Sequence, residues 1–299
     1  FSFLKGRKQR VKLGNCYLRW VELTGGMPQG TWLGPLTFVV YIDDLSPSCT
    51  IHKFVDDVTL TETVTKSNDP IHTEMPQFLD YLEDWSKNNN MHINFRKSKE
   101  MIMGTINKNP LPLLSVCDNT IDRVKCFKLL GINISDDLRW DAHINSLCLK
   151  VAPRLYYLKL LKRSGLPFDD LLCFYKSIIR SVLEYACVAW HHNLTAAQSD
   201  QIEALQKRAL RIILHPLSLP YITAVGYCEI ETLKSRRIVY QKKFFQRICQ
   251  PDDCLHHLLP PERDPALLAR LRHPYLYPVP FVRTKRYCSF INFALNNYQ

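Results

Sequence analysis

The chain has 299 residues, of which 46% are apolar, and its formal net charge at pH 7 is +11. A chain of this length and apolar content can bury a core, which excludes a disordered tail and predicts about two structural units. The longest apolar run, residues 32–42, is far shorter than the roughly 20 residues that a membrane-spanning helix needs, so we expect a soluble protein.

Positive charge is concentrated in the second half of the chain. Residues 1–144 hold 17 Lys and Arg against 17 Asp and Glu, whereas residues 145–299 hold 22 against 11. A basic half is typical of a surface that binds a polyanion, and we favour nucleic acid; a solvated basic surface without a specific partner is the alternative. The 11 scattered cysteines predict free thiols in a reducing compartment, the cytoplasm or the nucleus.

The first half of the chain predicts a mixture of strands and helices. Alternating and β-branched residues at 10–13 and 17–23, separated by a Gly-Asn pair, predict a hairpin. Apolar residues at helical spacing predict a largely buried helix at 31–45 and an amphipathic helix at 75–88. Further strands are expected at 51–55, 58–63, 91–95, 101–104 and 127–134.

From about residue 141 the apolar pattern becomes helical. Its period predicts helices at 144–163, 169–189 and 195–214, and one more near 231–249. Three successive helices form an all-α unit, so the predicted fold class is α+β: an antiparallel sheet with helices, followed by helices alone.

Two adjacent acids, Asp56 and Asp57, lie between the strands predicted at 51–55 and 58–63. Carboxylates at the bend of a tight hairpin can hold the two divalent ions that activate an attacking hydroxyl and stabilise a leaving phosphate. Taken alone, the pair fits a solvated acidic bend equally well. A second pair, Asp43 and Asp44, ends the helix predicted at 31–45, where the helix dipole disfavours anions, and we assign it to a solvated helix end.

An ordered series of motifs surrounds these acids. In chain order they are G-M-P-Q-G at 26–30, Y-I-D-D-L at 41–45, K-F-V-D-D at 53–57, I-N-F-R-K-S-K at 93–99 and F-K-L-L-G-I at 127–132. This order resembles the reverse transcriptases of non-LTR (LINE-type, CR1- or jockey-like) retrotransposons, truncated at the amino end. The resemblance implies a partial polymerase palm at 1–144, a helical thumb at 145–215 and a basic, Pro-containing region at 216–299. It also implies an RNA-directed DNA polymerase that uses two Mg²⁺ ions, deoxynucleoside triphosphates, an RNA template and a DNA primer.

The resemblance assigns roles to individual residues near the acids. Asp56 and Asp57 would hold the metal ions, while Gln29 and Gly30 would border the incoming nucleotide. Lys97 would donate a proton to departing pyrophosphate, although it is also one charge in a basic run.

Two more groups of residues are candidates for contact with nucleic acid. Leu130 and Gly131 lie in the segment that resembles the hairpin gripping the primer; this segment could instead be only a core strand, and the two roles are compatible. Lys207, Arg208 and Arg211 share one face of the helix predicted at 195–214, where they could contact phosphates or form a solvated face.

The sequence departs from the family pattern at its start. The family places its first metal-binding aspartate upstream of the segment that resembles residues 3–7, and here the chain begins at Phe1. We therefore expect a fragment that does not polymerise DNA by itself, because its set of metal ligands is short of one carboxylate. The alternative is a non-catalytic, nucleic-acid-binding relic or domesticated fragment.

Overall fold

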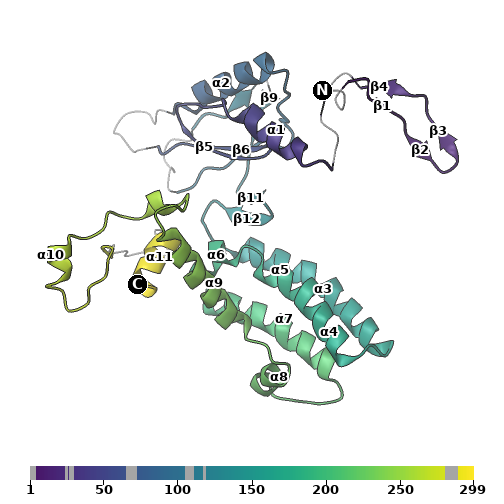
Figure 1. Cartoon of the computed structure of the whole chain (residues 1–299), viewed down its shortest axis with the longest axis vertical. Coiled ribbons are helices and arrows are strands. Elements are labelled where there is room, and N and C mark those ends of the chain that lie inside the picture. Colours follow the sequence, from purple (N-terminus) through teal and green to yellow (C-terminus); the bar gives the residue numbers. More distant parts are fainter. Residues whose placement is uncertain are drawn as a thin grey trace. The chain divides into compact units, whose positions relative to one another are not determined.

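The computed structural model describes residues 5–23, 26, 30–64, 73–104, 111–116, 119–279 and 289–299. The chain divides into two compact units: unit 1 comprises residues 1–100 and 106–123, and unit 2 comprises residues 101–105 and 124–299. In the described ranges, unit 1 contains short strand pairs and two helices, and unit 2 contains one hairpin followed by helices (Figure 1). The predicted α+β class is confirmed.

Unit 1 is built from short elements. Its strands are β1 (Lys8–Gln9), β2 (Lys12–Leu13), β3 (Cys16–Tyr17), β4 (Val21–Glu22), β5 (Thr50–Phe54), β6 (Asp57–Thr61), β7 (Lys99–Glu100), β8 (Ser115–Val116), β9 (Asn119–Thr120) and β10 (Asp122–Arg123), and its helices are α1 (Leu33–Ile42) and α2 (Met75–Asn88). These strands pair in antiparallel fashion except β7 with β10, which is a parallel pair. The hairpin predicted at the start of the chain is confirmed, because β1 pairs with β4 and β2 with β3.

Two small apolar clusters hold unit 1 together. One joins Leu79 on α2 to residues of the β8–β9 region, and the other joins Ile42 and Leu45 to Trp85 on α2. The second cluster fixes the end of α1 against α2, which places the segment that leads into β5.

Three predictions for unit 1 and its neighbouring segment are wrong. The helix predicted to be largely buried is exposed along most of α1, where Ile42 is its one buried residue. Only Phe38 and Ile42 of α1 join the cluster with Trp85, whereas Leu33, Leu36, Val39 and Val40 are exposed. Periodicity carries no information about which apolar residues a neighbouring element covers. Residues 91–95 and 101–104 are irregular or turn structure, and the strand in this region is the short β7.

Unit 2 begins with a hairpin and continues as helices. Its elements are β11 (Cys126–Leu129), β12 (Ile132–Ser135), α3 (Asp141–Arg163), α4 (Phe168–Phe174), a π-helical stretch (Tyr175–Arg180), α5 (Ser181–Glu184), α6 (Cys187–Trp190), α7 (Ala196–Leu214), α8 (Tyr221–Tyr227), α9 (Leu233–Ile248), α10 (Pro265–Leu268) and α11 (Phe290–Asn297). The helices predicted at 144–163, 195–214 and 231–249 are confirmed as α3, α7 and α9.

One continuous core stabilises unit 2. Leu147, Val151 and Leu158 of α3 are buried against residues of α4, the π-helical stretch and α7. α9 packs on α6 and α7, so residues from the C-terminal region complete this helical unit. α7 begins with a capping box, in which Thr195 and Gln198 satisfy each other's main-chain amides.

The sequence predicted one helix at 169–189 and one strand at 127–134, and both predictions are wrong. The helix ends at Glu184 because Tyr185 is extended and Ala186 is left-handed, with φ at +48°. The strand is in fact the β11–β12 hairpin, which agrees with the family resemblance rather than with the apolar pattern.

Candidate active site

Asp56 and Asp57 lie at the tip of the β5–β6 hairpin. Phe54 pairs with Asp57, so Val55 and Asp56 form a two-residue turn and Asp57 is the first residue of β6. Both carboxylates are exposed to solvent. The two acids are therefore adjacent in the chain at the solvent-exposed end of the hairpin.

Val55 adopts an unusual conformation for a β-branched residue. Its φ of +55° lies in the left-handed region, which costs a non-glycine residue roughly 1–3 kcal/mol. Strain of this kind persists only where the surrounding structure enforces it, and it is concentrated at functional sites. Here it allows the tight two-residue turn that pairs Phe54 with Asp57.

Lys53 anchors this hairpin to α1. Its amine donates hydrogen bonds to the main-chain carbonyls of Ile42 and Asp43, each at 2.9 Å. Both carbonyls lie at the C-terminal end of α1, where a cation is favourable because of the helix dipole. No role was predicted for Lys53 from the sequence, although it is the first residue of the K-F-V-D-D motif.

The second acidic pair, Asp43 and Asp44, takes part in local structural contacts. Asp43 caps the C-terminal end of α1, and Asp44 accepts a hydrogen bond from the indole of Trp85 at 3.0 Å. Both residues are exposed, as expected for a helix end. Asp44 nevertheless helps to orient α2, a role that the prediction of a merely solvated end did not include.

The structure describes the surroundings of two further predicted site residues, Gly30 and Lys97, but not those of Gln29. Gly30 has a φ of +81°, which suits glycine, whereas Gln29 lies outside the described residues. Lys97 is exposed in the turn at residues 95–97, and its main-chain amide bonds to Asn94. In the part of the chain that the structure describes, no hydrogen bond or ion pair connects Lys97 with Asp56 or Asp57.

The basic run around Lys97 separates into two kinds of residue. Lys99 forms an ion pair with Asp122 at 2.6 Å, across the β7–β10 pair. Lys97 forms no ion pair among the described residues, so its ammonium group is free to meet a ligand. The predicted role of Lys97 as a proton donor stays a prediction.

The chemistry of Asp56 and Asp57 fits Mg²⁺ in part. Mg²⁺ prefers carboxylate oxygens and is commonly held by one or two of them together with water and substrate phosphates. However, no group of three or more His, Cys, Asp or Glu that could hold a metal ion occurs in the described ranges. The hairpin by itself offers two carboxylates, fewer than the ligands that two metal ions need.

The β11–β12 hairpin in unit 2 carries Leu130 and Gly131 at its tip. Both residues have positive φ angles, +45° and +88° respectively, which close a two-residue turn between Leu129 and Ile132. Tyr185 donates a hydrogen bond from its hydroxyl to the carbonyl of Leu130 at 2.9 Å. A Cβ atom at Gly131 would lie 3.1 Å from the Tyr185 ring, so glycine is required by both backbone and packing.

Lys207, Arg208 and Arg211 are exposed on α7, as the helical spacing predicted. The amine of Lys207 lies 5.0 Å from the centre of the Tyr221 ring. None of the three cations forms an ion pair with another described residue. They constitute an unneutralised basic face, which we call the α7 face.

Comparison with known proteins shows which family the first part of the chain is related to. Residues 3–134 match the family described as "Reverse transcriptase (RNA-dependent DNA polymerase)". This segment, which includes the Asp56–Asp57 hairpin, therefore belongs to a reverse transcriptase domain.

The similarity extends further along the chain to reverse transcriptases of non-LTR retrotransposons. The chain is 25% identical over 223 residues to "Probable RNA-directed DNA polymerase from transposon X-element" of Drosophila melanogaster, and 26% identical over 227 residues to "RNA-directed DNA polymerase from mobile element jockey" of the same species. Each alignment covers 71% of this chain and 24% of the relative. The chain thus spans about a quarter of the length of these relatives, and its domain is related to theirs. No solved structure matches the chain.

In the described residues, no helix combines the length and the apolar character that crossing a membrane requires.

Proposed function

We propose that this chain is part of an RNA-directed DNA polymerase, with Asp56 and Asp57 as ligands of two Mg²⁺ ions. The observation that carries the proposal is the position of these two acids at the tip of a strained antiparallel hairpin, inside the segment that matches the reverse transcriptase family. When bound, the ions would activate the primer hydroxyl and stabilise charge on the departing pyrophosphate.

The other candidate residues would bind and orient the substrates. Gln29 and Gly30 would border the incoming deoxynucleoside triphosphate, and Lys97 would donate a proton to pyrophosphate. The tip at Leu130 and Gly131 would hold the DNA primer.

Different regions of the chain would have different roles in binding the template and primer. The α7 face would contact the phosphate backbone of the RNA template and primer, because such contacts need positive charge but no sequence specificity. In this proposal residues 1–144 are part of the palm, residues 145–215 are the thumb, and residues 216–299 are a basic extension. We further propose that the protein acts inside the cell, in the cytoplasm or the nucleus.

We expect the 299 residues alone to be inactive, because two carboxylates are an incomplete ligand set for two ions. The chain would then act as a polymerase only where a further carboxylate is supplied. The second candidate function is a non-catalytic, nucleic-acid-binding relic, and the lack of a third ligand among the described residues favours it. The genomic sequence upstream distinguishes the two: an open reading frame through another aspartate-bearing strand supports a polymerase, and stop codons support a relic.

Primer extension tests the proposed polymerase. This chain should give no DNA product on an RNA template with Mg²⁺ or Mn²⁺. A chimera in which residues 3–134 replace the matching segment of the jockey polymerase should extend the primer. Asp56→Asn and Asp57→Asn should each abolish that extension, and Asp43→Asn is the matched control that should keep it. Extension by the Asp56→Asn chimera at the parent's rate would overturn the assignment.

A further inference from the structure

The last helix of the chain, α11, packs on α9. Ala294 and Leu295 of α11 are buried in one apolar cluster with Phe245 of α9. This segment lies outside residues 3–134, so the match to the reverse transcriptase family assigns it no role. Its contacts nevertheless connect it, through α9 and α6, with the tip of the β11–β12 hairpin.

The first of these contacts is a hydrogen bond to a buried amide. Tyr298, directly after α11, donates its hydroxyl proton to Oε1 of Gln241 on α9 at 3.0 Å. Gln241 is fully buried, and its Nε2 donates a hydrogen bond to the main-chain carbonyl of Val188 in α6 at 3.3 Å. If the amide were turned over, its oxygen would face the oxygen of Val188, which is unfavourable inside a protein. Tyr298 therefore helps to orient the group that holds α6.

A second contact between α11 and the α6 region is aromatic. His192 lies two residues beyond α6, and its ring centre is 5.9 Å from that of Phe290 and 5.8 Å from that of Phe293. Both phenylalanines belong to α11. The C-terminal helix thus reaches the α6 region at two places, once through Gln241 and once directly.

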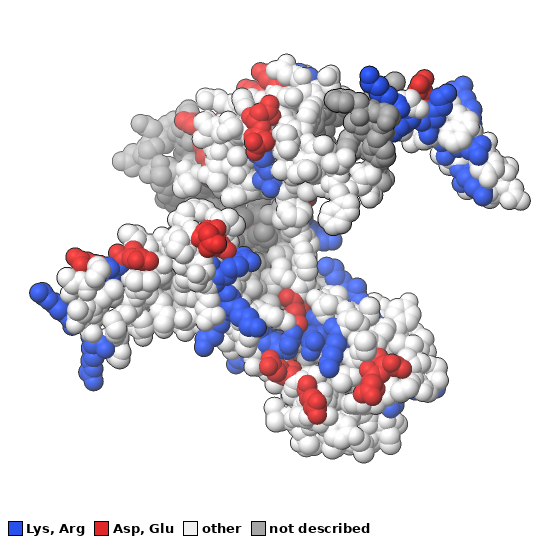
Figure 2. Space-filling model, in the orientation of Figure 1, with Lys and Arg blue, Asp and Glu red and all other residues white. Residues whose placement is uncertain are grey.

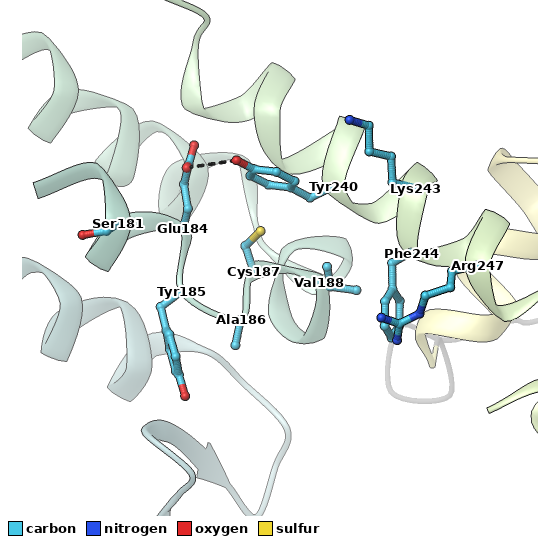
Figure 3. Close-up of a pocket in the computed structure, with 10 residues that line it drawn as sticks. All are labelled: Ser181, Glu184, Tyr185, Ala186, Cys187, Val188, Tyr240, Lys243, Phe244 and Arg247. Atoms are coloured by element: carbon cyan, nitrogen blue, oxygen red, sulfur yellow. Dashed lines mark hydrogen bonds between the residues drawn. The ribbon is translucent and has the colours of Figure 1, made fainter. Parts of the chain in front are cut away.

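α6 depends on such contacts because it is short and lies between two irregular segments. It is one turn of four residues, preceded by the left-handed Ala186 and followed by a 3-10 turn at His191–Asn193. A pocket of about 530 Å³ lies between this break and α9 (Figure 3), so close packing does not hold α6 on that side. Since a single helical turn is unstable by itself in water, side chains from α9 and α11 fix its position.

α6 is connected in turn to the β11–β12 tip through Tyr185. The indole of Trp190 donates a hydrogen bond to the main-chain carbonyl of Tyr185 at 3.1 Å, and the hydroxyl of Tyr185 donates one to the carbonyl of Leu130 at 2.9 Å. Figure 3 shows the Tyr185 ring pointing away from α9, toward the neighbouring β hairpin. The contacts from Tyr298 to Leu130 therefore form a continuous series within unit 2.

The groups that form this series are neutral. They are two tyrosine hydroxyls, a buried amide, an indole and main-chain carbonyls. The cations of α9 lie on its exposed side, where Figure 2 shows Lys and Arg side chains gathered along the helix. Because salt screens exposed charges but not buried neutral hydrogen bonds, the series should persist at high ionic strength.

We propose that α11 positions the β11–β12 tip, with Tyr298 acting through Gln241 and α6 on the turn at Leu130. Tyr298 is then a positioning residue, because it acts through other side chains. The inference rests on the proposed function in one respect, namely that this tip holds the DNA primer. It gives the C-terminal helix a part in placing the primer, while the metal-dependent chemistry stays with the β5–β6 hairpin.

Hydrogen exchange of the full chain tests whether Tyr298 influences the tip. Tyr298→Phe should speed amide exchange in β11 and β12 by about two- to fivefold, the range that corresponds to the net value of one hydrogen bond, at low and at high salt alike. Exchange in α3 and α7 should stay at the parental rate. Tyr275→Phe is the matched control, because Tyr275 is exposed in the same C-terminal region and its hydroxyl forms no hydrogen bond with a described residue.

A double variant distinguishes a series of contacts from a general loss of stability. Tyr185→Phe removes the last hydrogen bond of the series and should itself speed exchange at the tip. Adding Tyr298→Phe to it should change exchange there no further. Two independent losses of stability would instead multiply.

Four results would overturn the inference. They are parental exchange at the tip in Tyr298→Phe, an equal increase in Tyr275→Phe, a uniform increase that includes α3 and α7, and multiplied effects in the double variant. The measurement needs neither metal nor primer, so its outcome is independent of the polymerase assay. The role of the tip in holding the primer is tested separately, by primer extension.

Discussion

The hydroxyl of Tyr185 donates a hydrogen bond to the main-chain carbonyl of Leu130 at 2.9 Å, across 55 positions of the sequence. The bond joins the break after α5 to the tip of the β11–β12 hairpin. Two segments that sequence patterns treat as unrelated therefore form one local structure in unit 2.

Removing this bond should loosen the hairpin. Tyr185→Phe should lower the free energy of unfolding by about 1 kcal/mol, the usual net value of one hydrogen bond, and speed amide exchange in β11 and β12. Urea unfolding and hydrogen exchange measure the two effects. Tyr157→Phe, on an exposed tyrosine of α3, is the control that should change neither. Equal exchange rates in the parent and Tyr185→Phe would mean that the bond does not hold the hairpin.

Gly131 should tolerate no side chain. Gly131→Ala forces alanine to a φ of +88° and brings its Cβ within 3.1 Å of Tyr185, so the loss should exceed the roughly 1 kcal/mol expected from backbone strain alone. Gly165→Ala is a matched control with a similar φ of +85° and no atom within 4 Å of the added Cβ. Thermal unfolding compares the two variants, and equal losses would show that the Tyr185 ring contributes nothing.

Unit 2 should lose stability in acid because of His143. Its side chain is buried among Trp140, Trp190 and Asn133, and burial, helped by the nearby charge of Lys150, lowers its pKa from 6.5 to about 4. Above pH 6.5 the histidine is neutral in both the folded and the unfolded chain, so its contribution is complete. Between pH 6.5 and 4 the unfolded chain takes up a proton first, and the folded state loses up to about 3 kcal/mol.

Urea unfolding of the parent and His143→Leu across this pH range isolates that contribution. The parent should lose more stability than the variant as the pH falls from 6.5 to 4, and the difference should level off below pH 4. Parallel curves for the two proteins would contradict a depressed pKa.

The α7 face should bind nucleic acid through charge. Replacing Lys207, Arg208 and Arg211 by Gln should weaken binding to an RNA–DNA hybrid and reduce the salt slope by about 0.9 for each phosphate that is no longer neutralised. Filter binding over a series of salt concentrations measures both quantities. A parental slope in the triple variant would assign these cations to a solvated surface instead.

The elements that sequence predicted well are those specified locally. The Asp56–Asp57 hairpin follows from two short strand-forming runs around acids that tolerate a turn, and α7 follows from its period and its Thr195 cap. The break at Ala186 could not be predicted from local sequence, because apolar residues continue at helical spacing through it. Its left-handed conformation depends on tertiary packing instead. The exposure of α1 could not be predicted from the sequence either, since helical periodicity indicates an apolar face but not which element covers it.

The candidate site also contains residues that could be predicted from the sequence and interactions that could not. Asp56 and Asp57 could be selected from motif order, whereas the hydrogen bonds from Lys53 to α1 and from Tyr185 to Leu130 connect residues of different elements. Neither interaction leaves a periodic trace, so only a structure shows them. Both act on main-chain carbonyls, which any residue type supplies.

Direct metal binding provides the most decisive measurement. Electron paramagnetic resonance should show Mn²⁺ bound to the parent chain, absent when Asp56 and Asp57 are both replaced by Asn, and kept in the Asp43→Asn control. Mn²⁺ bound equally by the parent and the double variant, or missing only in the control, would contradict the assignment of the β5–β6 tip as the metal-binding end of the site.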